Sequence, residues 1–212
     1  MNPNICIVFN GGAVGDFFTM LINEQINNSV ISIDNRGMVT NCSKDFKVSC
    51  EKYYKSNDIQ VFQNIAWSSV VNTHHCNETI IKLFPDCKFY YIDDSACHNV
   101  TIDAFIVKRI NDKYKNLIDY FNQGETSFKD PSKVTVSNED VKRVMLKDWK
   151  RNILFWKQLG IQQVNIQHIV NKEKCRHTIE NIINYKLDYD KFSNTYNQYA
   201  SKNIDMIERI NG

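Results

Sequence analysis

The chain contains 212 residues, of which 42% are hydrophobic, 12% aromatic and 24% charged. These proportions are typical of a folded globular protein and exclude a chain that is mainly disordered or of low complexity. Its 26 Lys and Arg residues are balanced by 24 Asp and Glu residues, giving a formal net charge of +2. A generic nucleic-acid binder, which needs an excess of cations, is therefore not expected. The length favours a single domain, 1–212.

The longest apolar runs, such as Ile5 to Phe9, are strand-sized. A membrane span needs about 18 to 20 apolar residues, so none is expected. The N-terminus has no basic segment followed by a small-residue cleavage site, which argues against a secretory signal. We therefore expect a cytoplasmic protein that does not associate with membranes.

Seven cysteines, an odd number, are spread along the chain without a Cys-x-x-Cys pair. Neither a disulfide framework nor a zinc knuckle has this pattern. The sequence predicts reduced thiols and no metal site.

The N-terminal segment predicts a strand, a glycine loop and a helix in succession. Ile5 to Phe9 is a continuous apolar run that stops at Asn10-Gly11-Gly12, as a buried strand does before a turn. From Asp16 onward the apolar residues recur at helical spacing. Many α/β nucleotide-binding folds begin with such a unit.

Short apolar strands and helical segments continue to alternate through residue 92. We expect further strands at 30–33, 68–72 and 88–92, and helices at 44–55 and 78–84. This alternation predicts an α/β fold with a mainly parallel sheet flanked by helices.

The rest of the chain predicts a helical C-terminal part. Near-helical spacing extends over 101–121. Glu139 and Asp140 in a first turn and Gly160 at the end indicate a helix over 137–159, and two more helices are expected near 172–185 and 189–210. Between the first two segments, 124–137 is rich in Ser, Thr and Lys and predicts a surface excursion that acts as a lid or mobile loop.

The glycine loop is a candidate anion site formed by Gly11, Gly12, Val14, Gly15 and Asp16. Glycines allow close approach of the backbone, and the following helix N-terminus carries a partial positive charge. A Walker A loop is excluded, because Asp16 and the residue after it stand where Lys and Ser or Thr are required. The alternative is a tight turn in which Asp16 caps the helix.

A second candidate is the pair His74 and His75, which follows the expected strand at 68–72. The carboxyl end of a parallel strand is where α/β proteins build their sites, and a histidine there suits general-base catalysis. The alternative is a pair that faces solvent or is satisfied in the core.

In motif order the chain resembles the sulfotransferases that use 3′-phosphoadenosine 5′-phosphosulfate (PAPS) as donor and share the P-loop kinase fold. The loop 13–17 lies where that family has its Lys-Ser-Gly-Thr-Thr-like loop. Asn72-Thr73-His74 lies at the Lys-Thr-His motif, and Leu83-Phe84-Pro85 precedes the next strand as in the family. The segment 93–101 falls at the Arg-Asn-Pro-x-Asp-x-x-x-Ser motif that binds the 3′-phosphate.

The resemblance implies a P-loop, sulfotransferase-like three-layer architecture and the transfer of a sulfuryl group to a hydroxyl or amine acceptor. His74 matches the catalytic base, Gly15 the loop glycine and Thr101 the serine on the 3′-phosphate. The implied cofactor is PAPS, and the implied partners are this nucleotide-type donor and an acceptor.

The family's cations are absent from several matching positions. Ala13 and Asn72 replace lysines, and Asp93 replaces the phosphate-binding arginine. Two alternatives therefore stay open: a noncatalytic nucleotide- or protein-binding descendant of the fold, and a nucleotide-sugar-dependent transferase. A rebuilt donor site would draw its cations from elsewhere, for which the candidates are Lys108, Arg109, Lys150 and Arg151.

The helix expected at 137–159 interleaves basic and aromatic residues. This pattern is compatible with an anion-binding face. We favour the interpretation of a surface helix whose aromatic side packs into the core, because acidic residues share the helix.

Overall fold

Strand β1 (Ile5–Val8) is buried along its whole length, as expected for a central strand of a parallel sheet. The computed structural model describes residues 3–10, 14–27, 29, 32–35, 37–39, 44–63, 65–106 and 138–212. Helix α1 (Gly15–Asn27) follows the glycine loop and carries Asp16 in its first turn. The predicted strand and helix at the N-terminus are therefore confirmed.

Among the described residues, the sheet has four parallel strands in the order β2-β1-β3-β4. Strands β2 (Val70–Thr73) and β3 (Lys88–Asp93) lie on either side of β1, and β4 (Gln162–Asn165) pairs with β3 at the edge. This arrangement confirms the α/β fold with a parallel sheet flanked by helices and a helical C-terminal part.

The sequence did not predict β4 or the short helix α8 (Ile166–Val170) that follows it. Three of the four residues of β4 are amides, and only Val164 is buried. An edge strand of this kind lacks the apolar run by which β1 and β3 were found.

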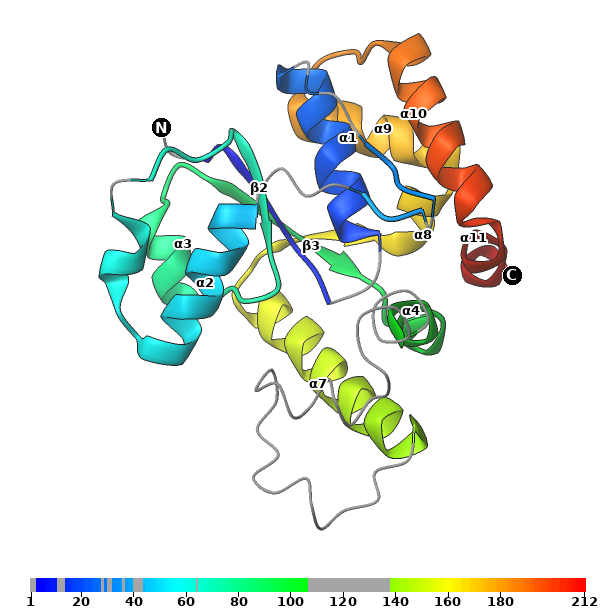
Figure 1. The fold of residues 1–212 in the computed structure, drawn as a ribbon. Helices are drawn as coiled ribbons and strands as arrows, with labels where there is room; N and C mark the ends of the chain where they lie inside the picture. Colours follow the sequence, from blue (N-terminus) through cyan, green and yellow to red (C-terminus); the bar gives the residue numbers. More distant parts are fainter. Residues whose placement is uncertain are drawn as a thin grey trace.

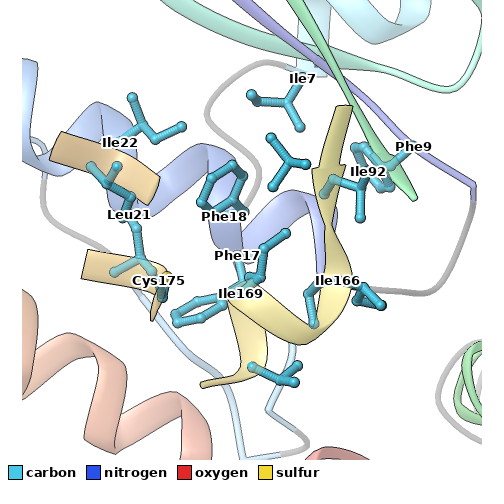
Figure 2. Close-up of a cluster of buried hydrophobic side chains, with 14 of the residues drawn as sticks. Ile7, Phe9, Phe17, Phe18, Leu21, Ile22, Ile92, Ile166, Ile169 and Cys175 are labelled. Atoms are coloured by element: carbon cyan, nitrogen blue, oxygen red, sulfur yellow. The ribbon is translucent and has the colours of Figure 1, made fainter. Parts of the chain in front are cut away.

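Helices cover both faces of the sheet (Figure 1). One face packs against α1, α8, α9 (Lys172–Ile183) and α10 (Tyr189–Lys202), and Figure 2 shows the apolar side chains that fill this layer. The other face packs against α2 (Lys44–Ser56) and the Trp156 side of α7 (Asn138–Gln158). Alternate residues of β1 point to opposite layers because side chains alternate along a strand.

Two short helices, η1 (Ile59–Phe62) and α3 (Glu78–Leu83), pack on the same face of the sheet as α2. Helix α3 confirms the predicted helix at 78–84, and α2 confirms the one at 44–55. Buried aromatic side chains of α2, η1 and the segment after α3 meet in this layer, among them Phe46, Phe62 and Phe84.

The prediction of one helix over 189–210 was wrong. Asn203 separates α10 from α11 (Ile204–Asn211), and its side-chain amide donates to the carbonyls of Tyr199 and Gly37. A side chain that hydrogen-bonds the backbone competes with the helical ladder, which accounts for the break.

Two other predicted elements differ in extent. Helix α4 (His98–Phe105) begins three residues before the predicted start at 101. Ile33 forms an isolated antiparallel bridge with Val39 and does not join the sheet. Residues 30 and 31 of the strand expected at 30–33, residues 107–121 of the helix expected at 101–121, and the loop at 124–137 lie outside the described residues.

Helix α7 confirms the predicted helix at 137–159. Trp149 and Trp156 are buried, as expected for its aromatic side, whereas Phe155 is 40% exposed. Within the described part of the chain, no helix has both the length and the apolar character that a membrane crossing requires.

Candidate functional site

The connections that leave β1 and β3 lead toward opposite edges of the sheet, so the strand order reverses between the carboxyl ends of these two neighbouring strands. From β1 the chain proceeds to β2 on one side, whereas β3 leads to β4 on the other. In open parallel sheets, ligands bind in the crevice outside the carboxyl ends of two such strands. The segments that follow these strands, Phe9-Asn10 and Asp94-Ser95, therefore border the expected site.

A buried hydrogen-bonded network joins these two strand ends. Asn10 Nδ2 donates to Asp94 Oδ1 over 3.1 Å, and Thr101 Oγ1 donates to Asp94 Oδ2 over 3.0 Å. Asn152 Nδ2 donates to Asn10 Oδ1 over 3.2 Å. The network thereby ties both strand ends to the helices α4 and α7.

The imidazole ring of His98, the first residue of α4, lies beside this network without a hydrogen bond to it. Its Nδ1 lies 3.2 Å from Asp94 Oδ1, and its side chain is only 3% exposed. The contact lacks the angles of a hydrogen bond, and neither ring nitrogen has a hydrogen-bond partner. The Trp149 indole and the His98 ring lie edge to face, with 6.4 Å between centroids.

His74 lies directly after β2 and contacts the chain just beyond β1. Its Nδ1 is 2.8 Å from the carbonyl oxygen of Phe9, and the two rings meet edge to face at 4.5 Å between centroids. A carbonyl can only accept, so Nδ1 carries the proton of the neutral imidazole and Nε2 is its basic nitrogen.

His75 has different surroundings. Its ring stacks on Tyr54 of α2 with 4.8 Å between centroids, and burial lowers its pKa. Its backbone N–H donates to Thr73 Oγ1. Of the two histidines, His74 is the one whose ring contacts the segment after β1.

Three of the five residues predicted for the glycine-loop site are described, whereas Gly11 and Gly12 lie outside the described residues. Val14 is buried in the core. A Cβ on Gly15 would lie 2.1 Å from an atom of the Phe9 ring. Packing against Phe9 therefore requires glycine at position 15, whatever the loop binds.

Asp16 takes part in a side-chain network at the first turn of α1. Asn72 Nδ2 donates to Asp16 Oδ1 over 3.0 Å and lies 3.3 Å from Thr19 Oγ1. Burial, with the nearby Asp16 carboxylate, raises the pKa of Tyr199. The two positions where the resembled family places a loop hydroxyl and a lysine are here hydrogen-bonded to each other.

The predicted 3′-phosphate position is also engaged within the protein. Thr101 is fully buried, and its hydroxyl contacts Asp94 and the carbonyl oxygen of His98. Asp93, at the position of the family's arginine, accepts hydrogen bonds from the Ser95 backbone and from Gln163. Three carboxylates, those of Asp16, Asp93 and Asp94, thus stand along the carboxyl edge of the sheet.

Sequence reasoning missed Asn10, Asp94, Asn152 and His98 as members of one network. The signal available was the position of Asn10 and Asp94 just after two apolar strands. Among the described residues, no group of three or more His, Cys, Asp or Glu side chains is arranged to hold a metal ion.

Comparisons of the chain with protein-family models, with curated proteins and with solved structures each gave no match.

Proposed function

We propose that the chain is a transferase of the sulfotransferase-like class, in which His74 is the general base toward an acceptor hydroxyl. The observation that carries this proposal is the 2.8 Å contact between His74 Nδ1 and the Phe9 carbonyl oxygen. The contact fixes the ring at the carboxyl edge of the sheet with Nε2 as the basic nitrogen.

The role of His74 is to receive a proton. As the acceptor oxygen forms its bond to the transferred group, the hydroxyl proton passes to Nε2 and the bond from that group to the donor's leaving oxygen breaks. General-base catalysis of this kind contributes about 10²- to 10⁴-fold to the rate.

PAPS, the donor implied by the resemblance, does not fit the described residues at the matching positions. Asp16 and Asn72 bond to each other, and Asp93 is a carboxylate bonded to the Ser95 amide. A carboxylate repels a phosphosulfate where a cation would bind it. We therefore assign no step to PAPS, and the nucleotide-type donor proposed here would have to place its phosphates away from these carboxylates.

A noncatalytic nucleotide-binding role is the second candidate. The Asp16 carboxylate, which Asn72 holds at the first turn of α1, argues against the transfer reaction and so for a noncatalytic role. A sulfuryl transferase concentrates positive charge near the leaving phosphate, and this turn carries a negative charge instead.

Calorimetric titration identifies the donor. The protein is titrated with 3′-phosphoadenosine 5′-phosphate, ATP and a nucleotide-sugar in parallel, at low and moderate salt. Micromolar binding that is selective for the first compound supports a PAPS-type donor, whereas selective binding of a comparator assigns that donor instead. If none of the three binds, the nucleotide-dependent transferase is refuted.

A transfer assay then separates the two candidates. The donor that binds is supplied in labelled form with a panel of phenolic and sugar hydroxyls, and His74→Gln is compared with His177→Gln, an exposed histidine on α9. We expect the rate to fall about 10²- to 10⁴-fold in the first variant only. Binding without transfer in the unmodified protein would favour the noncatalytic role, and equal rates in the two variants would remove His74 from the mechanism.

A further inference from the structure

The outward face of α7 carries a strip of cations. The exposed basic side chains on this helix are Arg143, Lys147, Lys150, Arg151 and Lys157. Their positions recur at intervals of three, four and seven residues, which places them on one side of a helix with 3.6 residues per turn. The other side of α7 contains the buried residues Trp149, Ile153 and Trp156. Figure 1 shows that α7 extends beyond the sheet, away from α9 and α10.

Two apolar side chains lie exposed on the same helix. Leu154 is 62% exposed and Phe155 is 40% exposed. Leu154 follows Lys150 by four residues and precedes Lys157 by three, so cations flank it on the helix surface. An apolar centre within a polar rim is the usual composition of a protein–protein interface. We call the surface formed by 147–157 on this side the outer face of α7.

Most of the charge on the outer face is open to a partner. Lys147, Lys150 and Lys157 form no ion pair with any residue that the structure describes. Arg151 pairs with Asp148 at 3.3 Å, with side chains that are 71% and 47% exposed. Exposed pairs of this kind contribute little to stability, so a carboxylate from outside can replace Asp148 at small cost.

The composition of the outer face favours a protein over a nucleic acid or a membrane. Single-stranded nucleic acids need several exposed aromatic rings on which bases stack, and of the three aromatic residues of α7 only Phe155 is exposed. A membrane surface needs a broad apolar helix face to insert. The broad apolar side of α7, which includes Ile153 and Trp156, packs in the core instead.

We propose that the outer face of α7 docks an acidic segment of another protein. Carboxylates of that segment pair with Lys147, Lys150 and Arg151, and one of its apolar side chains covers Leu154. Charge complementarity of this kind selects the partner and speeds its association, whereas the apolar contact slows its release. The inference goes beyond the transferase proposal and does not depend on it.

The length of the outer face sets the size of the segment. The distance from Lys147 to Lys157 along the helix is about 15 Å. A partner helix of about ten residues covers this length, as does an extended segment of about five residues. A peptide of twelve residues is therefore long enough to test the proposal in either conformation.

Selection from a random library of twelve-residue peptides, displayed on phage, tests the proposal with the full-length protein. We expect the selected peptides to be enriched in Asp and Glu and to share a Leu, Ile or Phe. The absence of any enriched peptide, or enrichment without acidic residues, would overturn the proposal.

Substitutions on the outer face show whether the selected peptide binds there. Leu154→Ser and Arg151→Glu change exposed side chains, so both variants are expected to fold. The matched controls are Ile204→Ser, an apolar residue of α11 that is 55% exposed, and Lys174→Glu, an exposed lysine of α9. Fluorescence anisotropy should give an affinity loss of at least about fivefold in the first two variants and none in the controls. Equal affinities in all four variants would place the peptide elsewhere and refute the docking face.

Two further probes and one further variant distinguish the alternatives. Vesicles that contain phosphatidylserine and a poly-uridine RNA are titrated into the same proteins. If no acidic peptide binds at the outer face, and one of these probes binds there in a manner that Leu154→Ser abolishes, that partner replaces the acidic protein segment. His74→Gln should bind the peptide with unchanged affinity, so a failure of the transferase proposal is read separately from a failure of docking.

Discussion

The side-chain amide of Asn10 donates a 3.1 Å hydrogen bond to the carboxylate of Asp94, although 84 positions separate the two residues. Both are almost fully buried, and each follows a central strand of the sheet. The bond therefore fixes the spacing of the two strand ends that border the candidate site.

Replacing Asn10 by Ala should destabilise the protein by about 1 to 3 kcal/mol. The substitution leaves Asp94 Oδ1 without the Asn10 donor in a buried setting and removes the acceptor of Asn152. The free energy of unfolding in urea measures this loss. Asn181→Ala, on the exposed side of α9, is the control and should change stability by less than about 0.5 kcal/mol. Equal effects of the two substitutions would contradict a structural role for the network.

Gly15→Ala should cost about 1 to 3 kcal/mol through overpacking, because its Cβ would collide with the buried Phe9 ring. The loss should shrink in a Phe9→Leu background, where that ring is absent. Urea unfolding of the two single variants and the double variant measures this coupling. If the two losses simply add, the steric explanation is wrong.

Gly160→Ala should also destabilise the protein, but for a different reason from Gly15→Ala. Gly160 has a φ of +71°, and a Cβ there would meet no atom within 4 Å. Its cost should come from the left-handed backbone alone, at about 1 to 2 kcal/mol. Phe9→Leu should leave this cost unchanged, which urea unfolding of the corresponding double variant tests.

The stability of the fold should decrease as pH rises above about 4.5 through the titration of Glu24. Burial raises the pKa of this carboxyl above its usual value of 4.5, although Thr195 donates a hydrogen bond to it and Lys191 lies nearby. The folded state thus binds the proton more tightly than the unfolded state, and this contribution is lost as the pH passes the raised pKa. Unfolding in urea between pH 4.5 and 7 measures the slope.

Glu24→Gln should flatten that slope, because the variant has no carboxyl to ionise at this position. Glu208→Gln, which changes an exposed glutamate of α11, serves as the matched control and should leave the slope unchanged. A slope that persists in Glu24→Gln would assign the pH dependence to other groups.

The described cysteines should resist alkylation in the native protein. All six are free and buried: Cys6, Cys50, Cys76, Cys87, Cys97 and Cys175. Burial raises the pKa of Cys50, Cys87 and Cys97 to about 12, so the reactive thiolate is scarce near neutral pH. Iodoacetamide at pH 8, read by peptide mass spectrometry, should modify them at least tenfold more slowly in buffer than in urea. Similar rates in both conditions would contradict their burial.

The sequence by itself determined most of the regular elements. Apolar runs predicted β1 and β3 and helical spacing predicted α1, because local periodicity records which side of an element is buried. Capping signals predicted α2 and α7. Where burial was slight, as in β4, the pattern was missing. The sequence also indicated that His74, which follows a parallel strand, would lie at the edge of the sheet where α/β proteins build their sites.

Only the tertiary structure decided which of these residues meet. Asn10, Asp94 and Asn152 come together because the strand order places β3 beside β1 and α7 packs across their ends. Likewise, Lys150 and Arg209 share a pocket because α7 and α11 both approach α4. Periodicity reports the environment of one residue at a time, whereas contacts between distant side chains depend on strand order and helix packing, which local patterns do not encode.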